Sequence, residues 1–491
     1  MAPLQDLRAY LAALEELSDV RTIDHEVDPH LEVGAIIRRS YETVAPAPLF
    51  TNIKGTDPGY RLLGAPGALS SAPGRPLARI ALSLGLDSGA SAREIVDALA
   101  DARTREPLQP VLVDSAPHAA PHKKNILLGD DASLDRSPTP LLHDGDGGPY
   151  VNTWGTIIAR TPDGSFTNWS IARIMMIDGK HMTGLVLHPQ HIAHVWQQWA
   201  DLGEPMPFAL VQGGEPALPF VSGMPLPDGI EEAGYLGALL GRPMELVQCE
   251  TVDLQVPASA EIVIEGHLSA ERTGVEGPMG EFAGYRPHET SQQPVYTIEA
   301  ITHRDDPIWP TVVEGEPVDE FHTATGLTLA AEALTALRAA GLPVTSAWEP
   351  FEMASHALVV SVAADWRERL PGIGTATLSR RITEVIDGLR CEYLVPRIFV
   401  LDDDVDASNT GELMWALATR VHPTERRIVR TGKVLPLLAV YSPEERHAWQ
   451  GPKVTYDALL PSADEGREPR SSFRHIFPQE IQQRVLKRWH A

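Results

Sequence analysis

The sequence contains few cysteines and no long apolar run. Its 491 residues include two cysteines, Cys249 and Cys391, which are too few for a disulfide framework or a four-thiolate metal site. No apolar run approaches the roughly 18 residues of a membrane-spanning helix. The N-terminal residues lack the basic and apolar segments of a secretion signal. These absences predict a cytoplasmic protein with no membrane partner.

Basic residues are also scarce. The chain has 41 Lys and Arg against 66 Asp and Glu, which gives a net charge of −25. A surface of this sign repels phosphate backbones, so the composition disfavours nucleic acid as a partner. The same field opposes small anionic ligands. A phosphate-bearing cofactor or a carboxylate substrate would therefore need local cations, which arginines, metal ions or helix N-termini can supply.

The order of apolar patterns predicts a multidomain α+β and α/β protein. Residues 1–110 alternate short apolar runs with helical periodicity, an N-terminal α/β unit. Residues 111–320 begin with an irregular stretch rich in Pro, Asp and Gly and continue as β-rich sequence. Residues 321–491 return to alternating helices and strands. The last predicted helix, 478–489, has an apolar stripe that must dock on another surface, with a second subunit as one candidate.

Turn signals divide the β-rich segment into hairpins. Pro162-Asp-Gly164 and Asp178-Gly179 lie between runs of β-branched and aromatic residues, the pattern of hairpin turns. The strand between these turns contains Asn168 and Arg173. An ideal strand places the two side chains on opposite faces, so a shared role requires a bulge or an abrupt end of the strand. The alternative is a hydrogen-bonded Asn168 and a surface Arg173.

Two more polar residues are predicted at helix N-termini. His191 opens a helix after Pro189, and Glu232 enters another helix from a Pro- and Gly-containing loop. The helix dipole there keeps an imidazole neutral, which is the form that binds metals. Together with Asn168 these donors favour Mn²⁺ or Mg²⁺ over structural zinc, because no cysteine is near. Alternatively, both residues cap their helices or face water, and spacing alone does not decide.

The stretch Glu276-Gly-Pro-Met-Gly-Glu281 places two carboxylates in a segment too rich in glycine and proline for a helix. Acidic residues in loops usually face water. The alternative is a pair of functional carboxylates on a loop whose glycines let the backbone approach a ligand closely.

Several long motifs, in order, resemble the UbiD family of prenylated-FMN-dependent decarboxylases, and in particular its ferulic acid and pyrrole-2-carboxylate decarboxylase branch. The motifs are DPHLEVGAIIRRSYE at 28–42, NWSIAR at 168–173, PQH at 189–191, SGMPLPDGIEEAGYLGALLG at 222–241, VPASAEIVIEG at 256–266, EGPMGE at 276–281 and SFRHIFP at 472–478. The resemblance runs over most of the chain. It implies a carboxy-lyase whose middle domain is a split β-barrel that binds the cofactor, in a homodimer.

The resemblance also implies a cofactor site. Prenylated FMN would come from a separate flavin prenyltransferase and would be held through a divalent ion, Mn²⁺ (or Mg²⁺), and a monovalent ion, K⁺ (or Na⁺). The divalent ion would take Asn168, His191 and Glu232, and the monovalent ion Trp169, Val221, Ser222, Met224 and Glu232. The cofactor would contact Asn168, Trp169, Ser170, Ile171, Ala172, Arg173, Gln190, His191, Glu232 and Arg397. At position 397 relatives typically have lysine, and arginine keeps the charge without the same donor geometry.

The same resemblance assigns catalytic roles to Arg173, Glu276 and Glu281. Glu281 is the candidate acid that protonates the α-carbon after CO₂ leaves, which requires a raised pKa. The substrate pocket would include Leu187, Gln190, Phe282, Phe321, Thr323 and Leu327, with a contribution from residues 434–439. This mostly apolar set favours an α,β-unsaturated acid, decarboxylated reversibly to an alkene, and an aromatic or heteroaromatic acid is the alternative.

Two other classes of function are also compatible with the sequence. The acidic run Asp402-Asp-Asp-Val-Asp406 follows a predicted strand and could hold Mg²⁺ in a phosphoryl-transfer enzyme. Aspartates at this position also cap a following helix. A noncatalytic flavin-binding protein of the same fold is the other alternative, which the intact Arg173, Glu276 and Glu281 disfavour.

Overall fold

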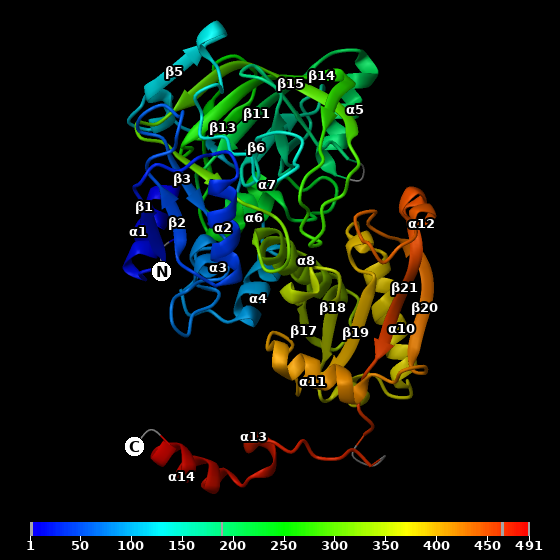
Figure 1. Ribbon diagram of the computed structural model, residues 1–491. Helices are drawn as coiled ribbons and strands as arrows, with labels where there is room; N and C mark the ends of the chain where they lie inside the picture. Colours follow the sequence, from blue (N-terminus) through cyan, green and yellow to red (C-terminus); the bar gives the residue numbers. More distant parts are fainter. Residues whose placement is uncertain (1–2, 188–189, 463–465, 490–491) are drawn as a thin grey trace.

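The computed structural model describes residues 3–187, 190–462 and 466–489 (Figure 1). Its N-terminal part is a small α/β layer. The elements are α1 (Leu7–Glu16), β1 (Val20–Ile23), α2 (Glu32–Glu42), β2 (Ala47–Phe50), β3 (Arg61–Gly64), α3 (Ala78–Ser83) and α4 (Ala92–Ala102). The sheet has the order β1-β2-β3-β16, in which β16 (Ile308–Thr311) arrives from far along the chain and pairs with β3 in parallel.

The middle of the chain folds into a large, curled, mostly antiparallel sheet that forms a half-barrel. Its order is β6-β9-β10-β15-β14-β11-β7-β8, and β5 (Asn125–Leu128) pairs with β15. The strands are β6 (Tyr150–Asn152), β7 (Thr156–Arg160), β8 (Thr167–Ser170), β9 (Ile174–Met176), β10 (His181–Gly184), β11 (Met206–Gln212), β14 (Ile262–Glu276) and β15 (Ser291–His303). The predicted hairpins are confirmed: β7 pairs with β8 and β9 with β10, both antiparallel.

Helices flank this sheet where the candidate residues lie. α5 (His191–Leu202) buries Ile192, Val195 and Trp196, three of the four residues that its helical periodicity predicts for the buried face. The fourth, Trp199, is half-buried. The short α6 (Leu218–Ser222) and α7 (Glu232–Leu240) follow. A smaller sheet, β13-β12-β4, is formed by β4 (Val111–Leu112), β12 (Glu245–Gln248) and β13 (Gln255–Pro257). The stretch 106–150, predicted as an irregular crossing, contains only β4, β5, the first residue of β6 and the 3-10 turns Pro121–Lys124 and Gly129–Asp131.

The C-terminal part is an α/β layer with the sheet order β17-β18-β19-β21-β20. Its strands are β17 (Val344–Trp348), β18 (Leu358–Val362), β19 (Arg397–Asp402), β20 (Arg427–Lys433) and β21 (Gln450–Asp457). Its helices are α8 (Glu320–Ala339), α9 (Trp366–Arg369), α10 (Thr375–Asp387), α11 (Thr410–Arg420) and α12 (Pro443–Ala448), with 3-10 turns at Phe351–Met353 and Glu392–Leu394.

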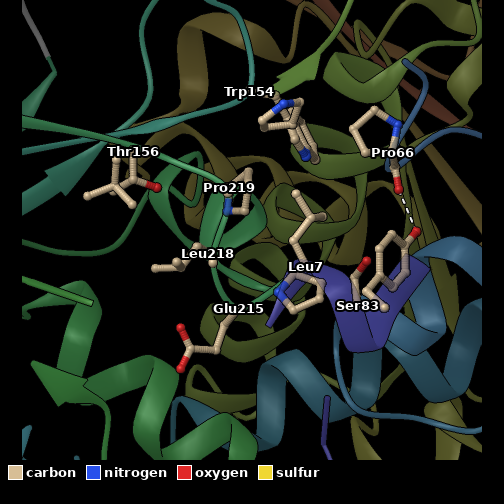
Figure 2. Close-up of a pocket in the computed structure, with 14 residues that line it drawn as sticks. Leu7, Pro66, Ser83, Trp154, Thr156, Glu215, Leu218 and Pro219 are labelled. Atoms are coloured by element: carbon tan, nitrogen blue, oxygen red, sulfur yellow. Dashed lines mark hydrogen bonds between the residues drawn. The ribbon is translucent and has the colours of Figure 1, made fainter. Parts of the chain in front are cut away.

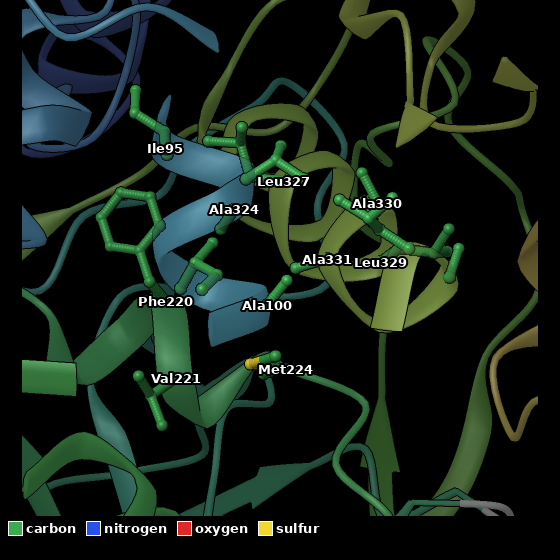
Figure 3. Packing of buried hydrophobic residues seen from close by; sticks show 14 of the residues in the cluster. Ile95, Ala100, Phe220, Val221, Met224, Ala324, Leu327, Leu329, Ala330 and Ala331 are labelled. Carbon is green, nitrogen blue, oxygen red and sulfur yellow. The ribbon is translucent and has the colours of Figure 1, made fainter. Parts of the chain in front are cut away.

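Helix α8 connects the half-barrel to the C-terminal layer and begins earlier than the sequence pattern predicts. The periodicity predicts a helix over 328–340, but the helix begins at Glu320 after a capping box between Asp319 and His322. The first turns are buried all round, so they carry no amphipathic stripe to reveal them. Small residues such as Ala324, Ala330 and Ala331 let α8 pack closely against α4 and α6 (Figure 3).

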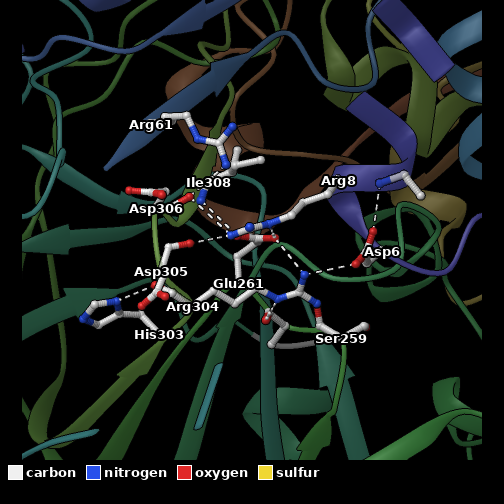
Figure 4. Close-up of polar contacts among 12 residues, drawn as sticks. Asp6, Arg8, Arg61, Ser259, Glu261, His303, Arg304, Asp305, Asp306 and Ile308 are labelled. Atoms are coloured by element: carbon white, nitrogen blue, oxygen red, sulfur yellow. Dashed lines mark hydrogen bonds and ion pairs between the residues drawn. The ribbon is translucent and has the colours of Figure 1, made fainter. Parts of the chain in front are cut away.

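A polar network fastens α1 to the half-barrel (Figure 4). The carboxylate of Glu261, which is fully buried, accepts hydrogen bonds from Arg8 Nε at 2.9 Å and Nη2 at 3.0 Å. The Ile308 backbone N–H donates to the same carboxylate at 3.1 Å, and Arg304 reaches Asp6 at 3.0 Å. The network therefore ties the N-terminal layer to the start of β14 and to β16.

The space between these layers is closely filled. Figure 2 shows a void between α1, α6 and the half-barrel, lined by residues such as Leu7, Trp154 and Leu218. Its volume is about 20 Å³, which accommodates one or two waters. It is a packing defect rather than a ligand site.

The C-terminal arm extends away from the body of the molecule (Figure 1). It contains α13 (Phe473–Ile476) and α14 (Gln479–Trp489), so the predicted terminal helix is present. Arg467 and Arg470 hold the start of the arm through ion pairs with Asp402 at 3.5 Å and Glu412 at 2.9 Å. None of the described α14 residues is buried. None of the described helices is long and apolar enough to cross a membrane.

Candidate active site

Arg173 and two carboxylates meet at the edge of the half-barrel. Arg173 Nε donates to Glu276 Oε1 at 2.7 Å and Nη2 to Oε2 at 3.0 Å, a bidentate pair. Its third nitrogen, Nη1, contacts Glu281. The local fold explains how one residue reaches both: β8 ends at Ser170 and β9 begins at Ile174, so Arg173 lies in the break between strands. A shared role for Asn168 and Arg173 requires the strand to end abruptly between them. The structure has this strand end.

The three side chains are withdrawn from water. Their exposed fractions are 13% for Arg173, 1% for Glu276 and 5% for Glu281. Burial raises the pKa of Glu281 above its ordinary value, while Arg173 opposes the shift. Burial alone would lower the pKa of Arg173, but the carboxylates of Glu281 and Glu276 raise it. Arg173 therefore keeps its charge, and the raised pKa of Glu281 favours the protonated form of that carboxyl.

The carboxylates have supporting residues that the sequence did not reveal. The Tyr150 hydroxyl donates to Glu276 Oε1 at 3.0 Å. Asp146 accepts from the Gly280 N–H at 3.0 Å and contacts His143 Nδ1 at 3.0 Å, which holds the Glu276–Glu281 loop from the other side. Gly277 has a positive φ of 81°, a conformation that favours glycine. No short motif marks Tyr150 or Asp146, because both act through contacts between segments distant in the chain.

A second polar cluster forms where two helices begin. His191 is the first residue of α5 and Glu232 the first of α7. His191 Nδ1 lies 3.5 Å from Glu232 Oε1, and Asn168 Nδ2 donates to the same oxygen at 3.2 Å. The other carboxylate oxygen accepts from the Trp169 N–H at 2.8 Å. Pro189, predicted to precede α5, lies outside the described residues. The structure thus brings together Asn168, His191 and Glu232, which are far apart in sequence.

This cluster has the donors that a metal-anchored phosphate requires. Asn168 is buried, and its Oδ1 has no hydrogen-bond partner in the described chain, so an oxygen ligand is left for a cation. The described residues contain no group of three or more His, Cys, Asp or Glu arranged for a metal ion; the expected set has two such residues and an asparagine. The converging helix N-termini favour an anion such as phosphate. The residues present therefore fit a bound divalent ion with a phosphate beside it.

Charged residues, a cavity and a buried hydroxyl group surround this cluster. His191 Nε2 faces Asp228 Oδ1 at 3.1 Å and also contacts Arg390. A cavity of about 660 Å³ opens at this end of the site, lined in part by Phe166, His191 and Glu231. Ser170 Oγ is buried without a partner in the described chain. This leaves a further polar atom near the cluster for a ligand.

The residues expected to hold a monovalent ion lie beside the same cluster. Val221 and Ser222 end α6, Met224 follows it, and Trp169 is in β8. Ser222 Oγ lies 2.9 Å from Thr156 Oγ1. The C-terminal end of a helix presents backbone carbonyls and partial negative charge, which suits a cation. Within the described residues the Arg397 guanidinium forms no ion pair, so its charge is available to an anionic ligand.

The expected substrate-pocket residues divide into two groups. Phe282 and Phe321 stack with their ring centroids 3.5 Å apart, and Val434 and Leu438 pack against the neighbouring Ala283. Thr323 instead donates its hydroxyl to the Gly67 carbonyl at 2.8 Å, and Leu327 is buried among the helices drawn in Figure 3. Leu187 and Gln190 are half-buried on either side of the undescribed residues 188–189.

The acidic run that could hold Mg²⁺ is instead paired with arginines. Both oxygens of Asp404 accept from Arg420, at 2.8 Å and 2.7 Å. Asp402 accepts from the Leu460 N–H at 2.8 Å and lies 3.5 Å from Arg467. These carboxylates therefore hold α11 and the start of the C-terminal arm, which is a structural use.

Comparison with protein-family models matches almost the whole chain. Three models match, described as the 3-octaprenyl-4-hydroxybenzoate carboxy-lyase N-terminal domain over residues 11–99, its Rift-related domain over 114–317 and its C-terminal domain over 322–458. All three are UbiD models.

Characterised proteins of similar sequence are decarboxylases. The chain is 38% identical to pyrrole-2-carboxylic acid decarboxylase of Pseudomonas aeruginosa, covering 99% of this chain and 97% of that protein. It is 40% identical to ferulic acid decarboxylase 1 of Saccharomyces cerevisiae, covering 86% and 84%.

Solved structures of similar fold include a decarboxylase and a UbiD-class enzyme bound to prFMN. Vanillic acid decarboxylase of Sedimentibacter hydroxybenzoicus in its closed form superposes with a TM-score of 0.83 at 25% identity, covering 100% of this chain and 99% of that one. An evolved dimeric form of the UbiD-class enzyme HmfF from Pelotomaculum thermopropionicum, in complex with prFMN, gives 0.77 at 27% identity, covering 93% and 95%.

Proposed function

The chain belongs to the UbiD family and is a carboxy-lyase, and from that premise we propose that it decarboxylates an α,β-unsaturated, acrylic-type acid to an alkene and CO₂ with prenylated FMN. The reaction is reversible and non-oxidative. An aromatic or heteroaromatic acid is the second candidate substrate. The observation that carries the proposal is the buried Arg173–Glu276–Glu281 constellation beside a cluster of metal donors.

The chain's own residues have distinct tasks in this reaction. When bound, prenylated FMN supplies an electron sink for the pair left behind as CO₂ departs. Glu281 holds a proton in a site screened from water and delivers it to the α-carbon. Arg173 stabilises the carboxylate that Glu281 becomes, and Glu276 fixes the orientation of Arg173 through its bidentate pair.

We propose that Asn168, His191 and Glu232 hold Mn²⁺ or Mg²⁺, and that Trp169, Val221, Ser222, Met224 and Glu232 hold K⁺ or Na⁺. The unpartnered Asn168 Oδ1 and the two helix N-termini support this arrangement. The two ions, the N-termini of α5 and α7 and Arg397 would hold the phosphate of the cofactor. Residues 168–173 and Gln190 would contact the rest of the cofactor.

The substrate preference rests on the aromatic pair. Phe282 and Phe321 are apolar and stack on each other, so a planar unsaturated acid fits beside this pair better than a strongly polar one. The pyrrole-2-carboxylic acid and vanillic acid decarboxylases among the similar proteins favour the aromatic alternative. The two candidates differ in the product, an alkene or an arene, and one assay separates them.

The proposal includes partners and a division of the chain. A separate flavin prenyltransferase supplies the cofactor, and the protein is a cytoplasmic homodimer that binds its carboxylic acid without nucleic acid or membrane. The domains are 1–110, 111–320, which binds the cofactor, and 321–491, which carries the oligomerisation arm. The exposed apolar residues of the arm, such as Phe477 and Leu486, support a second subunit as its partner.

The test is purification with and without a coexpressed flavin prenyltransferase. Absorption and mass spectra then identify the bound flavin, and metal analysis identifies the ions. CO₂ release is measured from cinnamic-type, pyrrole-type and hydroxybenzoic acids. We expect turnover only in the prenyltransferase-supplied protein and the highest rate with a cinnamic-type acid. Equal activity without prenylated FMN would rule the proposal out.

A further inference from the structure

The Asp- and Gly-rich stretch 143–148, within the irregular crossing, packs directly on the loop that carries the two catalytic carboxylates. The Gly147 N–H donates to the Pro278 carbonyl oxygen at 2.8 Å. A Cβ atom on Gly147 would collide with the carbonyl group of Gly277, so the two backbones approach each other as closely as glycine allows. The stretch is therefore built against residues 276–281 rather than crossing them loosely.

Asp146 is at the centre of this contact. Its side chain has an exposed fraction of 0%. One carboxylate oxygen, Oδ1, accepts from the Gly280 N–H at 3.0 Å. The other, Oδ2, accepts from the His143 backbone N–H at 3.0 Å and faces His143 Nδ1 at 3.0 Å. Since Gly280 directly precedes Glu281, the position of Asp146 determines where the backbone of Glu281 begins.

His143 extends the contact to a third segment. Its Nε2 lies 2.8 Å from the backbone oxygen of Glu314, which follows β16. A carbonyl oxygen only accepts, so Nε2 carries a proton, and the carboxylate of Asp146 favours a second proton on Nδ1. The same ring covers Gly280, where a Cβ atom would lie 2.7 Å from it. His143 thus fixes both the carboxylate of Asp146 and the loop beneath the ring.

The residue after Glu281 is anchored as well. His322 Nε2 lies 2.8 Å from the Phe282 backbone oxygen, and the Asp319 N–H donates to His322 Nδ1 at 3.0 Å. Glu281 therefore lies between two held backbone positions, Gly280 and Phe282. His322 also belongs to the cap of α8, whereas the side-chain contacts of Asp146 are confined to His143 and Gly280 within the described residues. Substitution of Asp146 is thus the more specific way to release the acid.

We propose that Asp146 and His143 are positioning residues that hold Glu281 against Arg173, in the place from which it delivers its proton. The inference rests on the proposed function. The two residues contact the backbone of the loop and act through Glu281, without touching the substrate or the cofactor. A displacement of about 1 Å at a reacting group can cost about 100-fold in rate, so this support affects the chemical step more than binding.

Asp146 also acts on Glu281 through its charge. Burial raises the pKa of Glu281, Arg173 lowers it, and Glu276 and Asp146 raise it further. A neutral residue at position 146 removes one of the influences that raise this pKa, so the pKa should fall. The decline of kcat on the alkaline side should then move to lower pH. A loss of stability alone would not move this decline.

The test compares Asp146→Ala and Asp146→Asn with the wild-type holoenzyme. Alanine removes both hydrogen bonds, and we expect kcat to fall about tenfold to 100-fold, with KM and flavin content unchanged. Asparagine keeps an oxygen for the Gly280 N–H but has no charge, so it should retain more of kcat and shift the alkaline decline to lower pH. The matched control is Asp144→Asn, an exposed aspartate of the same stretch, which should match wild type in both respects.

Substitutions of His143 test the other member of the pair. Glutamine can still donate to the Glu314 backbone oxygen, and alanine cannot. We therefore expect His143→Gln to retain more of kcat than His143→Ala, with flavin content unchanged in both. Equal kcat in wild type and His143→Ala would remove His143 from the proposed role.

Crystal structures provide a measurement that needs no turnover. Glu281 should lie against Arg173 in the wild-type protein and be displaced from it in Asp146→Ala. Wild-type kcat in Asp146→Ala, or an unmoved Glu281 in its structure, would overturn the inference while the proposed function stands. If wild type turns over no acid, the proposed function fails, and the structures alone decide whether Asp146 positions Glu281.

Discussion

At Glu281, burial and a neighbouring arginine act in opposite directions on one carboxyl group. Burial raises its pKa, and Arg173 lowers it without cancelling the rise. An acid catalyst needs both influences, because it must hold a proton before the reaction and be stable as a carboxylate afterwards. Glu276, bound to the same Arg173, sets the position of that arginine.

Substituting Glu281 by Gln tests this role. The amide retains the size and a hydrogen-bonding oxygen, so we expect the variant to keep prenylated FMN. Loss of the proton should lower kcat by about 100-fold or more. Turnover is measured with the best acid from the screen, and flavin content by absorbance. Wild-type kcat in this variant would remove Glu281 from its proposed role.

The pH dependence of kcat tests the direction of the pKa shift at Glu281. Because the folded pKa of Glu281 is raised, the proton is present below that pKa and is lost as pH rises through it. The wild-type kcat should therefore decline on the alkaline side of a pKa higher than that of an ordinary glutamate.

At the scale of elements, the first residues of two helices and one residue of a short strand form the proposed ion site. α5 and α7 begin at His191 and Glu232, and β8 carries Asn168 to meet them. Each element supplies one proposed metal ligand. Removal of one ligand should therefore weaken the binding of the ions and of the flavin phosphate together.

We expect His191→Ala to lose divalent metal and prenylated FMN in parallel. The imidazole is one of three proposed ligands, and its loss should weaken metal binding by about 10-fold or more, by analogy with losses at supporting residues of metal sites. Metal analysis and flavin absorbance are the measurements. Gln197→Ala, on the exposed face of the same helix, is the control and should keep both. Full occupancy in His191→Ala would refute the assignment.

The sequence predicts those elements whose signals lie within a few neighbouring residues. The hairpins around 162–164 and 178–179 were predictable because their turn residues specify the geometry, and α5 because its buried face repeats at helical spacing. The pairing of β16 with β3 carries no such signal, since it depends on packing between distant segments. The candidate site was predicted from motifs, while Tyr150, which no motif marks, became visible only through its contact with Glu276.

The attachment of α1 to β14 rests on one buried carboxylate. Glu261 is fully buried and faces both Arg8 and Arg304. We expect Glu261→Gln to lower the free energy of unfolding by about 3 kcal/mol, because a buried charged group loses its partner. Urea denaturation measures the change. The exposed pair Arg39–Glu42 is the control, and Glu42→Gln should change stability by less than about 0.5 kcal/mol. Equal effects of the two substitutions would contradict a structural role for the Glu261 network.

At the scale of the whole molecule, the chain is acidic, but positively charged groups lie near the proposed cofactor and substrate sites. Against a net charge of −25, Arg173, Arg390 and the N-termini of α5 and α7 lie around the two polar clusters. Such local cations overcome the repulsion that the rest of the surface exerts on an anionic acid and a flavin phosphate. Binding of both should therefore weaken as salt screens these charges.

The C-terminal arm leads to the last prediction, which concerns assembly. Ion pairs of Arg467 and Arg470 fix where the arm leaves the body, yet Phe477, Leu486 and Trp489 beyond them are 50%, 55% and 75% exposed. Such a stripe is stabilised only when another surface covers it. We expect removal of residues 472–491, and also Leu486→Glu, to convert a dimer into monomers in light scattering coupled to size exclusion. Lys487→Glu, which alters charge without apolar area, should stay dimeric. A dimer that survives the truncation would place the interface elsewhere, and a monomeric wild-type protein would refute the arm's proposed role.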